Sequence, residues 1–400
     1  MKIAMYTDHF YPELGGIQDS VALTARSLGA CGHQIDIFAP RHPAADFAKI
    51  GRTAEAPDLG HNVKVYRRLS LPFASSTQQS RAVIPLLTSL FAGVGRRRPD
   101  VIHSHSFFGL GLEALAIGHL LGVPVVGTNH TNVRGFGPYI PVSIEKAVGW
   151  VAWYYNRCAA ITAPSRSVFE GLGAGRMRHV PHILSNPIDT EVFHPPGAAS
   201  RPATRRSFGL TGAARDGKLI VYAGRLGREK NIDIVLRALA EPGCRATIAI
   251  AGHGAYEPQL RALAAGLGIT QRVVFLGTLA PPRLAELFGA ADLFTMMSTT
   301  ETQSMATLQA MACGLPVIAS AGGAVAEYID SGAGRLVDPH DAGALAATIA
   351  ELLADTGLCR RLGLAGRDVA QRHSVHNVTT AWEALYQGLL PKARFAWSKA

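Results

Sequence analysis

The sequence predicts an α/β protein with two doubly wound, Rossmann-like domains that face each other across a cleft. Short β-like runs alternate with stretches of helical periodicity along the chain, and this pattern stops and starts again near the middle. Alternation of strand and helix is typical of parallel sheets. The chain has 400 residues, of which 48% are hydrophobic and 17% are charged. Each of two domains can therefore bury a core of its own.

The predicted strands of the first half are short apolar runs. Segments in which apolar residues recur at helical spacing separate them, such as DSVALTARSLGACG (19–32). The strands are KIAMYT (2–7), QIDIFAP (34–40), VKVYRR (63–68), VIHSH (101–105), PVVGTNH (124–130) and AAITAPS (159–165).

A second set of strands and helices follows in the same alternation. The strands are KLIVYAGRL (218–226), ATIAIAGHG (246–254), VVFLGT (273–278), DLFTMMS (292–298), LPVIAS (315–320) and GRLVDP (334–339). The predicted helices are DIVLRALAE (233–241), EPQLRALAAGLG (257–268), PRLAELFGAA (282–291) and MATLQAMACG (305–314).

A segment rich in Pro, Gly, Ser and Arg, residues 185–209, predicts a linker between the two sets. We therefore place a first Rossmann-like domain at 1–190 and a second at 191–380, and expect 381–400 to run back across the first domain. Ligands of doubly wound sheets bind outside the carboxyl ends of the strands. The cleft between the domains is thus the expected site.

Several classes of protein are disfavoured. The five cysteines are scattered without a C-x-x-C pair, so neither a disulfide framework nor a zinc site is expected. The apolar run at the N-terminus meets Asp8 too early for a secretory signal, which favours the cytoplasm. No segment predicts a membrane span. Residues 82–94 could form either an interfacial helix or a core helix.

The formal net charge of +10 calls for an acidic partner or a solvated basic surface. The clusters lie at Arg67-Arg68, Arg96-Arg97-Arg98 and Arg176/Arg178. Aromatic residues make up 7% of the chain, and no nucleic-acid recognition motif interleaves them with these clusters. An anionic membrane surface is therefore favoured over nucleic acid.

Two cations lie on the loop after the predicted strand 218–226. Arg225 and Lys230 would face the carboxyl end of the sheet, where a planar guanidinium and a mobile ammonium suit a diphosphate. By themselves they could equally belong to a solvated loop.

The stretch TETQSMATLQAMACG (300–314) predicts a helix that begins near Ser304 and stops at Gly314. The backbone amides of Gln303, Ser304 and Met305 would form an anion pocket. Glu301 lies outside this pocket, where its carboxylate could accept hydrogen bonds from sugar hydroxyls. Gln309 lies about 12 Å from Glu301 at a helical rise of 1.5 Å per residue. This is comparable with the distance from a hexose, across a diphosphate, to a ribose, so Gln309 could contact the nucleoside.

The sequence resembles glycosyltransferase family 4, the retaining nucleotide-sugar transferases of the GT-B fold. The likeness covers nearly the whole chain, and it implies that the domain at 1–190 binds the acceptor and the domain at 191–380 binds the nucleotide-sugar donor. It rests on GGIQDSV (15–21), GTNHT (127–131), SNPIDTEVFHP (185–195), GRLGREKNIDIVLRAL (224–239), AGHG (251–254), VVFLGTL (273–279) and residues 300–320.

The resemblance implies roles for these residues. Arg225 and Lys230 hold the donor diphosphate, and Glu301 binds hydroxyls of the transferred sugar. The amides of Gln303, Ser304 and Met305 complete the donor contacts. The loop at Gly15 and Gly16 closes over the donor, and His130 lies beside the donor sugar.

The family usually carries a second Glu at the position of Gln309, so this protein departs from the pattern at the ribose contact. The other histidines, including His103 and His105, are expected to be structural or to contact the acceptor.

The implied reaction is transfer with retention, by front-face attack of the acceptor hydroxyl and without a protein nucleophile, metal or cofactor. UDP-glucose or UDP-galactose is favoured over GDP-mannose as donor. TDHFYP (7–12), residues 130–141 and TETQ (300–303) are similar to diacylglycerol glucosyltransferases and phosphatidylinositol mannosyltransferase-like members. A membrane-lipid acceptor and a peripheral place on the inner face of the cell membrane are therefore expected.

Other functions stay open. The acceptor could instead be a soluble or polyprenyl-linked glycan in polysaccharide assembly. A nucleotide-sugar 2-epimerase, a nucleic-acid binder and a poorly active transferase are further alternatives. The sequence does not predict the oligomeric state.

Overall fold

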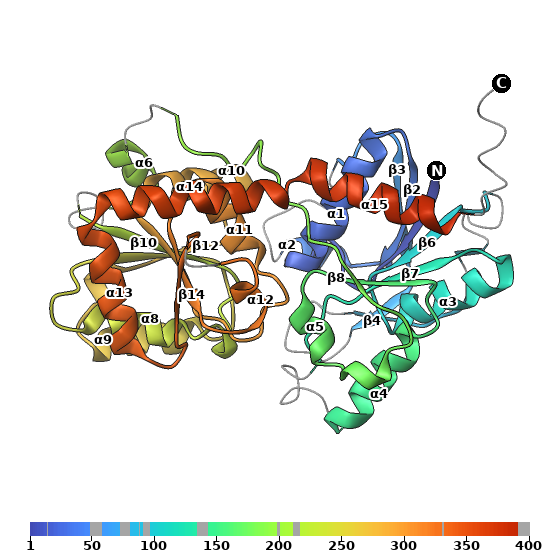
Figure 1. Ribbon diagram of the computed structural model, residues 1–400, viewed down its shortest axis with the longest axis horizontal. Coiled ribbons are helices and arrows are strands. Elements are labelled where there is room, and N and C mark those ends of the chain that lie inside the picture. The colour runs from blue at the N-terminus through green and yellow to red at the C-terminus, as the bar shows by residue number, and fades with distance from the viewer. Residues whose placement is uncertain are drawn as a thin grey trace. The chain divides into compact units, whose positions relative to one another are not determined.

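The computed structural model describes residues 1–13, 15–48, 58–72, 81–87, 89–90, 97–133, 143–197, 201–210, 217–329 and 332–390. The chain divides into two compact units (Figure 1). Unit 1 comprises Met1–Pro187 and Val375–Ala400, and unit 2 comprises Ile188–Ser374. The predicted boundary at 190/191 thus lies three residues too late, and residues 375–380 belong to unit 1 instead of the second domain.

Unit 1 is built on a parallel sheet of seven strands in the order β3-β2-β1-β6-β7-β8-β9. The chain starts in the middle of the sheet, adds strands to one side, and then returns to the other side of β1. The strands are β1 Lys2–Tyr6, β2 Gln34–Pro40, β3 Val63–Arg68, β6 Val101–Ser104, β7 Val125–Thr128, β8 Ala160–Ala163 and β9 His182–Ile183. The predicted doubly wound arrangement is confirmed for this unit.

The helices of unit 1 cover both faces of its sheet. The core of this unit accordingly consists of two separate apolar clusters. They are α1 Gly16–Ala30, α2 Ala44–Ala48, α3 Gly109–Leu121, α4 Ile144–Tyr155, α5 Arg166–Glu170, the 3₁₀ turn η3 Ala174–Arg176 and α15 Val375–Leu389. Helix α15 packs along α1 (Figure 1) and buries Val378, Trp382 and Tyr386 in one of these clusters. The C-terminal helix is therefore part of the first domain's core.

Unit 2 repeats the plan with a parallel sheet of six strands in the order β12-β11-β10-β13-β14-β15. The strands are β10 Leu219–Ala223, β11 Thr247–Ala251, β12 Val273–Gly277, β13 Leu293–Met296, β14 Val317–Ser320 and β15 Arg335–Val337. All residues of β10, β11 and β13 are buried, as expected for parallel strands with helices on both faces. The second doubly wound domain is confirmed as well.

The helical elements of unit 2 are α6 Arg201–Ser207, η4 Arg228–Lys230, α8 Ile232–Ala240, α9 Glu257–Gly266, η5 Thr270–Arg272, α10 Pro281–Ala290, α11 Met305–Ala312, α12 Gly323–Ala326, α13 Ala342–Ala354 and α14 Thr356–Arg372. Within the described residues, no single helix is long and apolar enough to cross a membrane. The pair α13 and α14 meets the length and composition criteria jointly but is bent by 101°.

One local prediction was wrong, and a second was incomplete. The expected helix at 82–94 begins as the strand β5 Arg81–Val83, which pairs antiparallel with β4 Ser70–Pro72, and residues 88 and 91–94 lie outside the described part of the chain. An apolar run of this length does not distinguish helix from strand. The predicted linker 185–209 contains α6, which is anchored because the buried Arg205 pairs with Asp292 at 2.9 Å.

Candidate functional site

The candidate site in unit 2 lies where the direction of sheet growth reverses, between the adjacent strands β10 and β13. The loop after β10 runs from Gly224 to Asn231, and the loop after β13 runs from Met297 to Ser304. Carboxyl ends of neighbouring parallel strands open the ligand crevice of doubly wound folds at this point. The sheet order therefore brings the two predicted donor-binding segments side by side.

An ion pair joins the two loops. Nζ of Lys230 lies 2.5 Å from Oε1 of Glu301, and their side chains are 14% and 15% exposed. A hydrogen bond also joins the two loops: Nδ2 of Asn231 donates to the carbonyl of Met297 at 2.9 Å. Asn231 adopts the left-handed conformation (φ 50°) at the start of α8. Lys230 and Glu301 are thus held together without a ligand.

The surroundings of Glu301 keep it ionised. Burial favours the neutral acid. The charge and hydrogen bond of Lys230 act in the opposite direction. Together with a hydrogen bond to Ser298 and the charge of Arg225, they lower the pKa of Glu301 below its ordinary value. Glu301 therefore offers a carboxylate to hydrogen-bond donors at neutral pH.

Arg225 is also paired within its own loop. Its Nη2 lies 2.5 Å from Oε1 of Glu229, with the two side chains 40% and 15% exposed. The Tyr222 hydroxyl donates to the Arg225 carbonyl at 3.0 Å and fixes the backbone of the loop. The sequence predicted the two cations of this segment, but their acidic partners were missed. Glu229 was indicated by its spacing of four residues from Arg225, whereas Glu301 lies 71 positions from Lys230.

The helix after β13 begins where the sequence predicted. The Ser304 hydroxyl caps α11 by accepting from the Thr307 amide at 3.4 Å, and Ser304 itself has φ 66°. A non-glycine residue in this conformation is uncommon and costs energy. The Tyr328 hydroxyl donates to the Gln303 carbonyl and holds the turn in place.

The first backbone amides of α11 point along the helix axis toward its N-terminus. These amides lack acceptors within the helix and carry the positive end of its dipole. Gln303 and Ser304 are buried, whereas Met305 and Gln309 are half-buried one turn apart on α11. The arrangement can hold an anion at the helix start, with the Gln309 amide four residues on.

Two glycines that the sequence analysis did not single out as functional hold the neighbouring loop in place. Gly252 follows β11 with φ 143°, and a Cβ there would lie 1.9 Å from the Gly224 carbonyl oxygen. A Cβ on Gly254 would lie 2.2 Å from the Leu226 carbonyl oxygen. The loops also share a hydrogen bond, because the Leu226 amide donates to the His253 carbonyl at 3.0 Å. Glycine is therefore required for this close approach.

His130 of unit 1 follows β7 and is 8% exposed. Its Nε2 lies 3.0 Å from Nδ1 of His105, which follows β6. The ring of His103 packs on His105 with centroids 3.9 Å apart. The three histidines thus form one cluster at the carboxyl ends of adjacent strands, a contact that nothing in the sequence indicated.

Burial keeps this cluster neutral. It lowers the pKa of His103 to about 3, with a contribution from His130, and that of His130 to about 4, with a contribution from His9. Burial and the two neighbouring histidines hold the pKa of His105 well below its ordinary range. No cation from this cluster is available at neutral pH.

The loop after β1 carries Gly15 and Gly16 to the start of α1, where the Asp19 amide donates to the Gly15 carbonyl. Next to them, the buried Glu13 accepts from the Gln18 side chain at 3.0 Å and pairs with Nδ1 of His9 at 2.8 Å. Burial disfavours the charged imidazolium, but Glu13 and Asp8 raise the pKa of His9. Only the two glycines of this loop were named from the sequence, and its acidic anchor Glu13 was missed.

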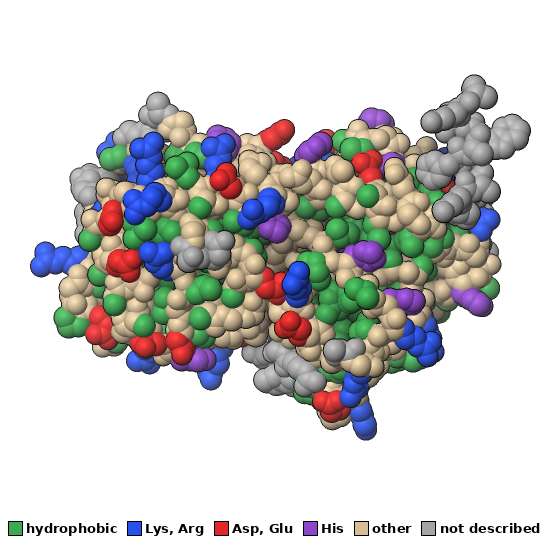
Figure 2. Space-filling model, viewed as in Figure 1, with side chains coloured by type: hydrophobic (Ala, Val, Ile, Leu, Met, Phe, Trp, Pro, Cys, Tyr) green, Lys and Arg blue, Asp and Glu red, His purple; other side chains and the backbone are tan. Residues whose placement is uncertain are grey.

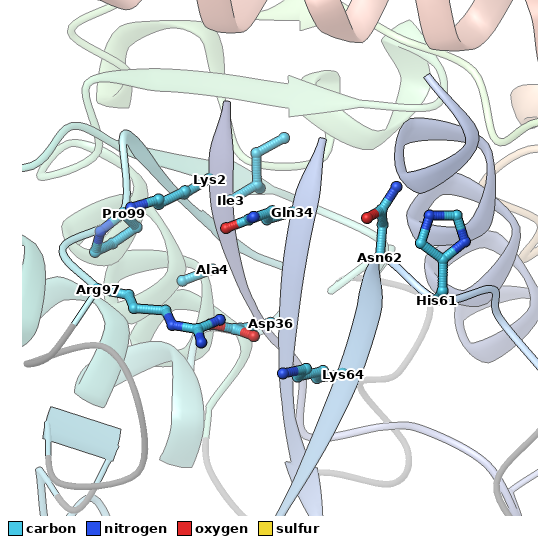
Figure 3. Close-up of a pocket in the computed structure, with 10 residues that line it drawn as sticks. All are labelled: Lys2, Ile3, Ala4, Gln34, Asp36, His61, Asn62, Lys64, Arg97 and Pro99. Atoms are coloured by element: carbon cyan, nitrogen blue, oxygen red, sulfur yellow. The ribbon is translucent and has the colours of Figure 1, made fainter. Parts of the chain in front are cut away.

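A cavity of about 130 Å³ lies at the end of the unit 1 sheet where β1, β2 and β3 begin (Figure 3). Lys2, Gln34 and Asn62, which line it, stand at or just before the first residues of β1, β2 and β3. It is therefore at the amino ends of the strands. Ligands of doubly wound sheets bind at the carboxyl ends, so this cavity is not the expected substrate site.

The predicted basic clusters are less free than the sequence suggested. The Arg67 guanidinium donates to the Pro40 carbonyl at 3.0 Å and lies over the Phe10 ring at 5.4 Å. Arg176 pairs with Glu145 at 2.7 Å. Arg96 lies outside the described residues. On the face in Figure 2, Lys and Arg are scattered among Asp and Glu, with no large patch of one sign.

In the parts of the chain that the structure describes, no group of three or more His, Cys, Asp or Glu side chains is placed to hold a metal ion. The five cysteines, all within those parts, are free.

Two family models match the chain in succession. Glycosyltransferase Family 4 matches residues 14–192, and Glycosyl transferases group 1 matches residues 205–369. The two matches follow the division into unit 1 and unit 2. They include Gly15, Gly16 and His130 in the first match, and Arg225, Lys230 and Glu301 in the second.

Three relatives span most of the chain. A D-inositol 3-phosphate glycosyltransferase of Acidothermus cellulolyticus is 30% identical over 99% of this chain and 92% of its own length. An alpha-monoglucosyldiacylglycerol synthase of Streptococcus pneumoniae is 27% identical over 80% of this chain and 71% of the relative. The sulfoquinovosyl transferase SQD2 of Arabidopsis thaliana is 28% identical over 78% of this chain, which spans 61% of that relative.

The fold also matches solved structures. Anabaena HepE, solved in complex with UDP-glucose, aligns over 97% of this chain and 100% of its own with a TM-score of 0.78 and 18% identity. A likeness at this identity concerns the fold, which is GT-B. Together with the family models and the relatives, it shows that this chain is a glycosyltransferase of family 4.

Proposed function

We propose that this enzyme transfers a hexose, with retention of the anomeric configuration, from a uridine-diphosphate sugar to an acceptor hydroxyl. The observation that carries the proposal is the Lys230–Glu301 ion pair, 2.5 Å long, beside the start of α11. It places a cation, a carboxylate and a helix N-terminus on adjoining loops. A sugar diphosphate offers the complementary groups, which are hydroxyl donors next to a dianion.

Each group has a role in binding the donor. The ammonium of Lys230, the Arg225 guanidinium and the amides of Gln303, Ser304 and Met305 neutralise the diphosphate. The Glu301 carboxylate accepts hydrogen bonds from sugar hydroxyls, and Gln309 binds the ribose. Gly15 and Gly16 allow the backbone of unit 1 to approach the donor, and His130 contacts the transferred sugar.

The bond that breaks joins the anomeric carbon to the diphosphate oxygen, and the bond that forms joins this carbon to the acceptor oxygen. Negative charge grows on the departing diphosphate, so the cations and helix amides stabilise the transition state more than the ground state. The leaving diphosphate takes the proton of the acceptor hydroxyl on the same face of the sugar. We propose that no metal or cofactor is required, because Lys230, Arg225 and the helix amides take the place of a metal ion beside the diphosphate.

For the acceptor we propose a membrane lipid such as diacylglycerol. The streptococcal relative is named as a synthase of alpha-monoglucosyldiacylglycerol, which is a glycosylated diacylglycerol, and this similarity supports a lipid acceptor. The net charge of +10 favours an anionic membrane surface. The enzyme would then act from the cytoplasm as a peripheral protein on the inner face of the cell membrane. A polyprenyl-linked or soluble glycan acceptor in polysaccharide assembly is the alternative.

Thermal unfolding with UDP-glucose, UDP-galactose and GDP-mannose tests the donor. The true donor raises the midpoint, because it binds only the folded protein. We expect a UDP-sugar to give the largest rise and the Lys230→Met variant to lose it. A larger rise with GDP-mannose would reject the choice of nucleotide. Release of an epimerised sugar from the donor alone would reject transfer in favour of epimerisation.

Incubation of the preferred UDP-sugar with vesicles tests the acceptor. Vesicles of phosphatidylglycerol with added diacylglycerol should yield a glycosylated lipid, whereas the same vesicles without diacylglycerol should not. Cosedimentation with anionic but not with neutral vesicles is expected. Equal binding to both, with no lipid product, would favour the alternative acceptor.

A further inference from the structure

His105 is buried against His130 and makes one hydrogen bond with its ring. Its Nδ1 lies 3.0 Å from Nε2 of His130, and its side chain is 6% exposed. The other ring nitrogen of His105, Nε2, is buried without a hydrogen-bond partner. This asymmetry determines how protons are shared between the two rings.

Both rings are neutral at pH 7, because burial lowers their pKa values. A neutral imidazole has one N–H donor and one acceptor nitrogen. If Nε2–H of His130 donated the shared bond, His105 would carry its own proton on the buried Nε2, where nothing accepts it. If Nδ1–H of His105 donates, its bare Nε2 is only an unused acceptor. Buried donors without a partner are rarer than buried acceptors without one, so the second arrangement is favoured.

We propose that His105 is a positioning residue that holds the proton of His130 on Nδ1, so that His130 presents an N–H donor to the bound sugar. This inference rests on the proposed function, in which His130 contacts the transferred sugar. No hydrogen bond of His130 Nδ1 occurs within the described residues, and this nitrogen is not among the fully buried, unpartnered atoms. It is therefore available to a hydroxyl oxygen of a ligand.

The ring of His105 is held in this orientation from behind. His103 packs on it with ring centroids 3.9 Å apart. Both nitrogens of His103 have partners, because Nε2 lies 2.6 Å from the Thr128 hydroxyl and Nδ1 lies 2.7 Å from the Tyr386 hydroxyl. Tyr386 belongs to α15, so the C-terminal helix fixes the layer on which the His105 ring rests.

Nitrogen-15 NMR of the full chain, labelled on histidine, reads the tautomer directly. The His130 signals are identified by their loss in His130→Gln. In the wild type we expect the His130 proton on Nδ1. In His105→Leu, which removes the donor, we expect it to move to Nε2. In His105→Asn, whose amide places an N–H near the position of Nδ1, it should stay on Nδ1. A wild-type His130 protonated on Nε2, or an unchanged tautomer in His105→Leu, would overturn the proposal.

Transfer from the preferred UDP-sugar gives the second readout. His105→Leu should lower kcat/KM by about tenfold, the size of one lost hydrogen bond, while His105→Asn stays within about threefold of the wild type. His61→Ala, an exposed histidine of the same unit, is the control and should match the wild type. Equal losses in His105→Leu and His105→Asn would assign His105 a packing role only. If the wild type transfers no sugar, the proposed function fails, and the NMR spectrum still decides the tautomer.

Discussion

Nζ of Lys230 and Oε1 of Glu301 lie 2.5 Å apart, although the two residues are 71 positions apart in the chain. The contact joins the loops that follow β10 and β13, the two strands on either side of the reversal point of the sheet. Both side chains are mostly buried, so a change to one partner leaves the other as a partly buried charge. Substitution of either residue is therefore expected to change the stability of the fold as well as the proposed binding of the donor.

Single substitutions of the pair should remove activity and keep the fold. We expect Lys230→Met and Glu301→Gln each to lower kcat/KM by about 100-fold or more, because groups that stabilise the transition state are lost. Lys230→Met should also destabilise the protein by about 2 kcal/mol, since Glu301 is left without its counter-charge. Steady-state kinetics and urea unfolding measure the two effects.

The double variant Lys230→Met/Glu301→Gln is the control for this coupling. Its loss of stability should be smaller than that of Lys230→Met alone, because no uncompensated charge remains. Wild-type turnover in either single variant would remove the pair from the proposed site.

Stability should depend on pH through Glu301. Its pKa is lower in the folded protein than the ordinary value of 4.5, so the ionised carboxylate stabilises the fold above that pH. The contribution is lost as the pH falls below 4.5 through the lowered pKa, because the unfolded chain then binds the proton more readily. The unfolding midpoints of the wild type and Glu301→Gln should converge on acidification from about pH 7 to about pH 3. A constant difference between them would contradict the pair's role in stability.

Gly252 should tolerate no side chain. In Gly252→Ala, the new Cβ would meet the Gly224 carbonyl oxygen at 1.9 Å in a backbone of φ 143°. We expect destabilisation by about 2–4 kcal/mol and loss of thermal protection by the donor. Gly266→Ala at the end of α9, with nothing within 4 Å, is the matched control and should be neutral or slightly stabilising. Similar behaviour of the two variants would show that the close approach is unimportant.

Gln309→Glu tests the residue that departs from the family pattern. A carboxylate accepts stronger hydrogen bonds from ribose hydroxyls than an amide does, so the Kd for UDP should fall by about three- to tenfold. Isothermal titration calorimetry gives this value. Gln259→Glu, which makes the same charge change at an exposed position of α9, should leave the Kd unchanged. Weaker UDP binding by Gln309→Glu would place the ribose elsewhere.

Features that depend on nearby residues were predictable from the sequence. The buried strands β10 and β11 follow from continuous apolar runs, and the start of α11 at Ser304 follows from its local cap. The helix predicted at residues 82–94 was wrong for the converse reason. Their apolar pattern fits helix and strand equally, and pairing with β4 makes residues 81–83 a strand.

The partners of Lys230 and His130 could not be predicted from the sequence. Nothing near Lys230 in the chain indicates Glu301, and nothing near His130 indicates His105, 25 residues earlier. In both cases adjacent parallel strands bring the loops together, and the order of the strands decides which loops meet.

The two doubly wound domains, the family and the residue types at the candidate donor site could thus be read from the sequence, because periodicity, helix caps and short motifs are local properties. Only the tertiary structure shows that Lys230 is paired with Glu301, that His130 is hydrogen-bonded to His105, and that α15 completes the core of unit 1. These are contacts between distant segments, and their energies exist only once the sheet has been assembled.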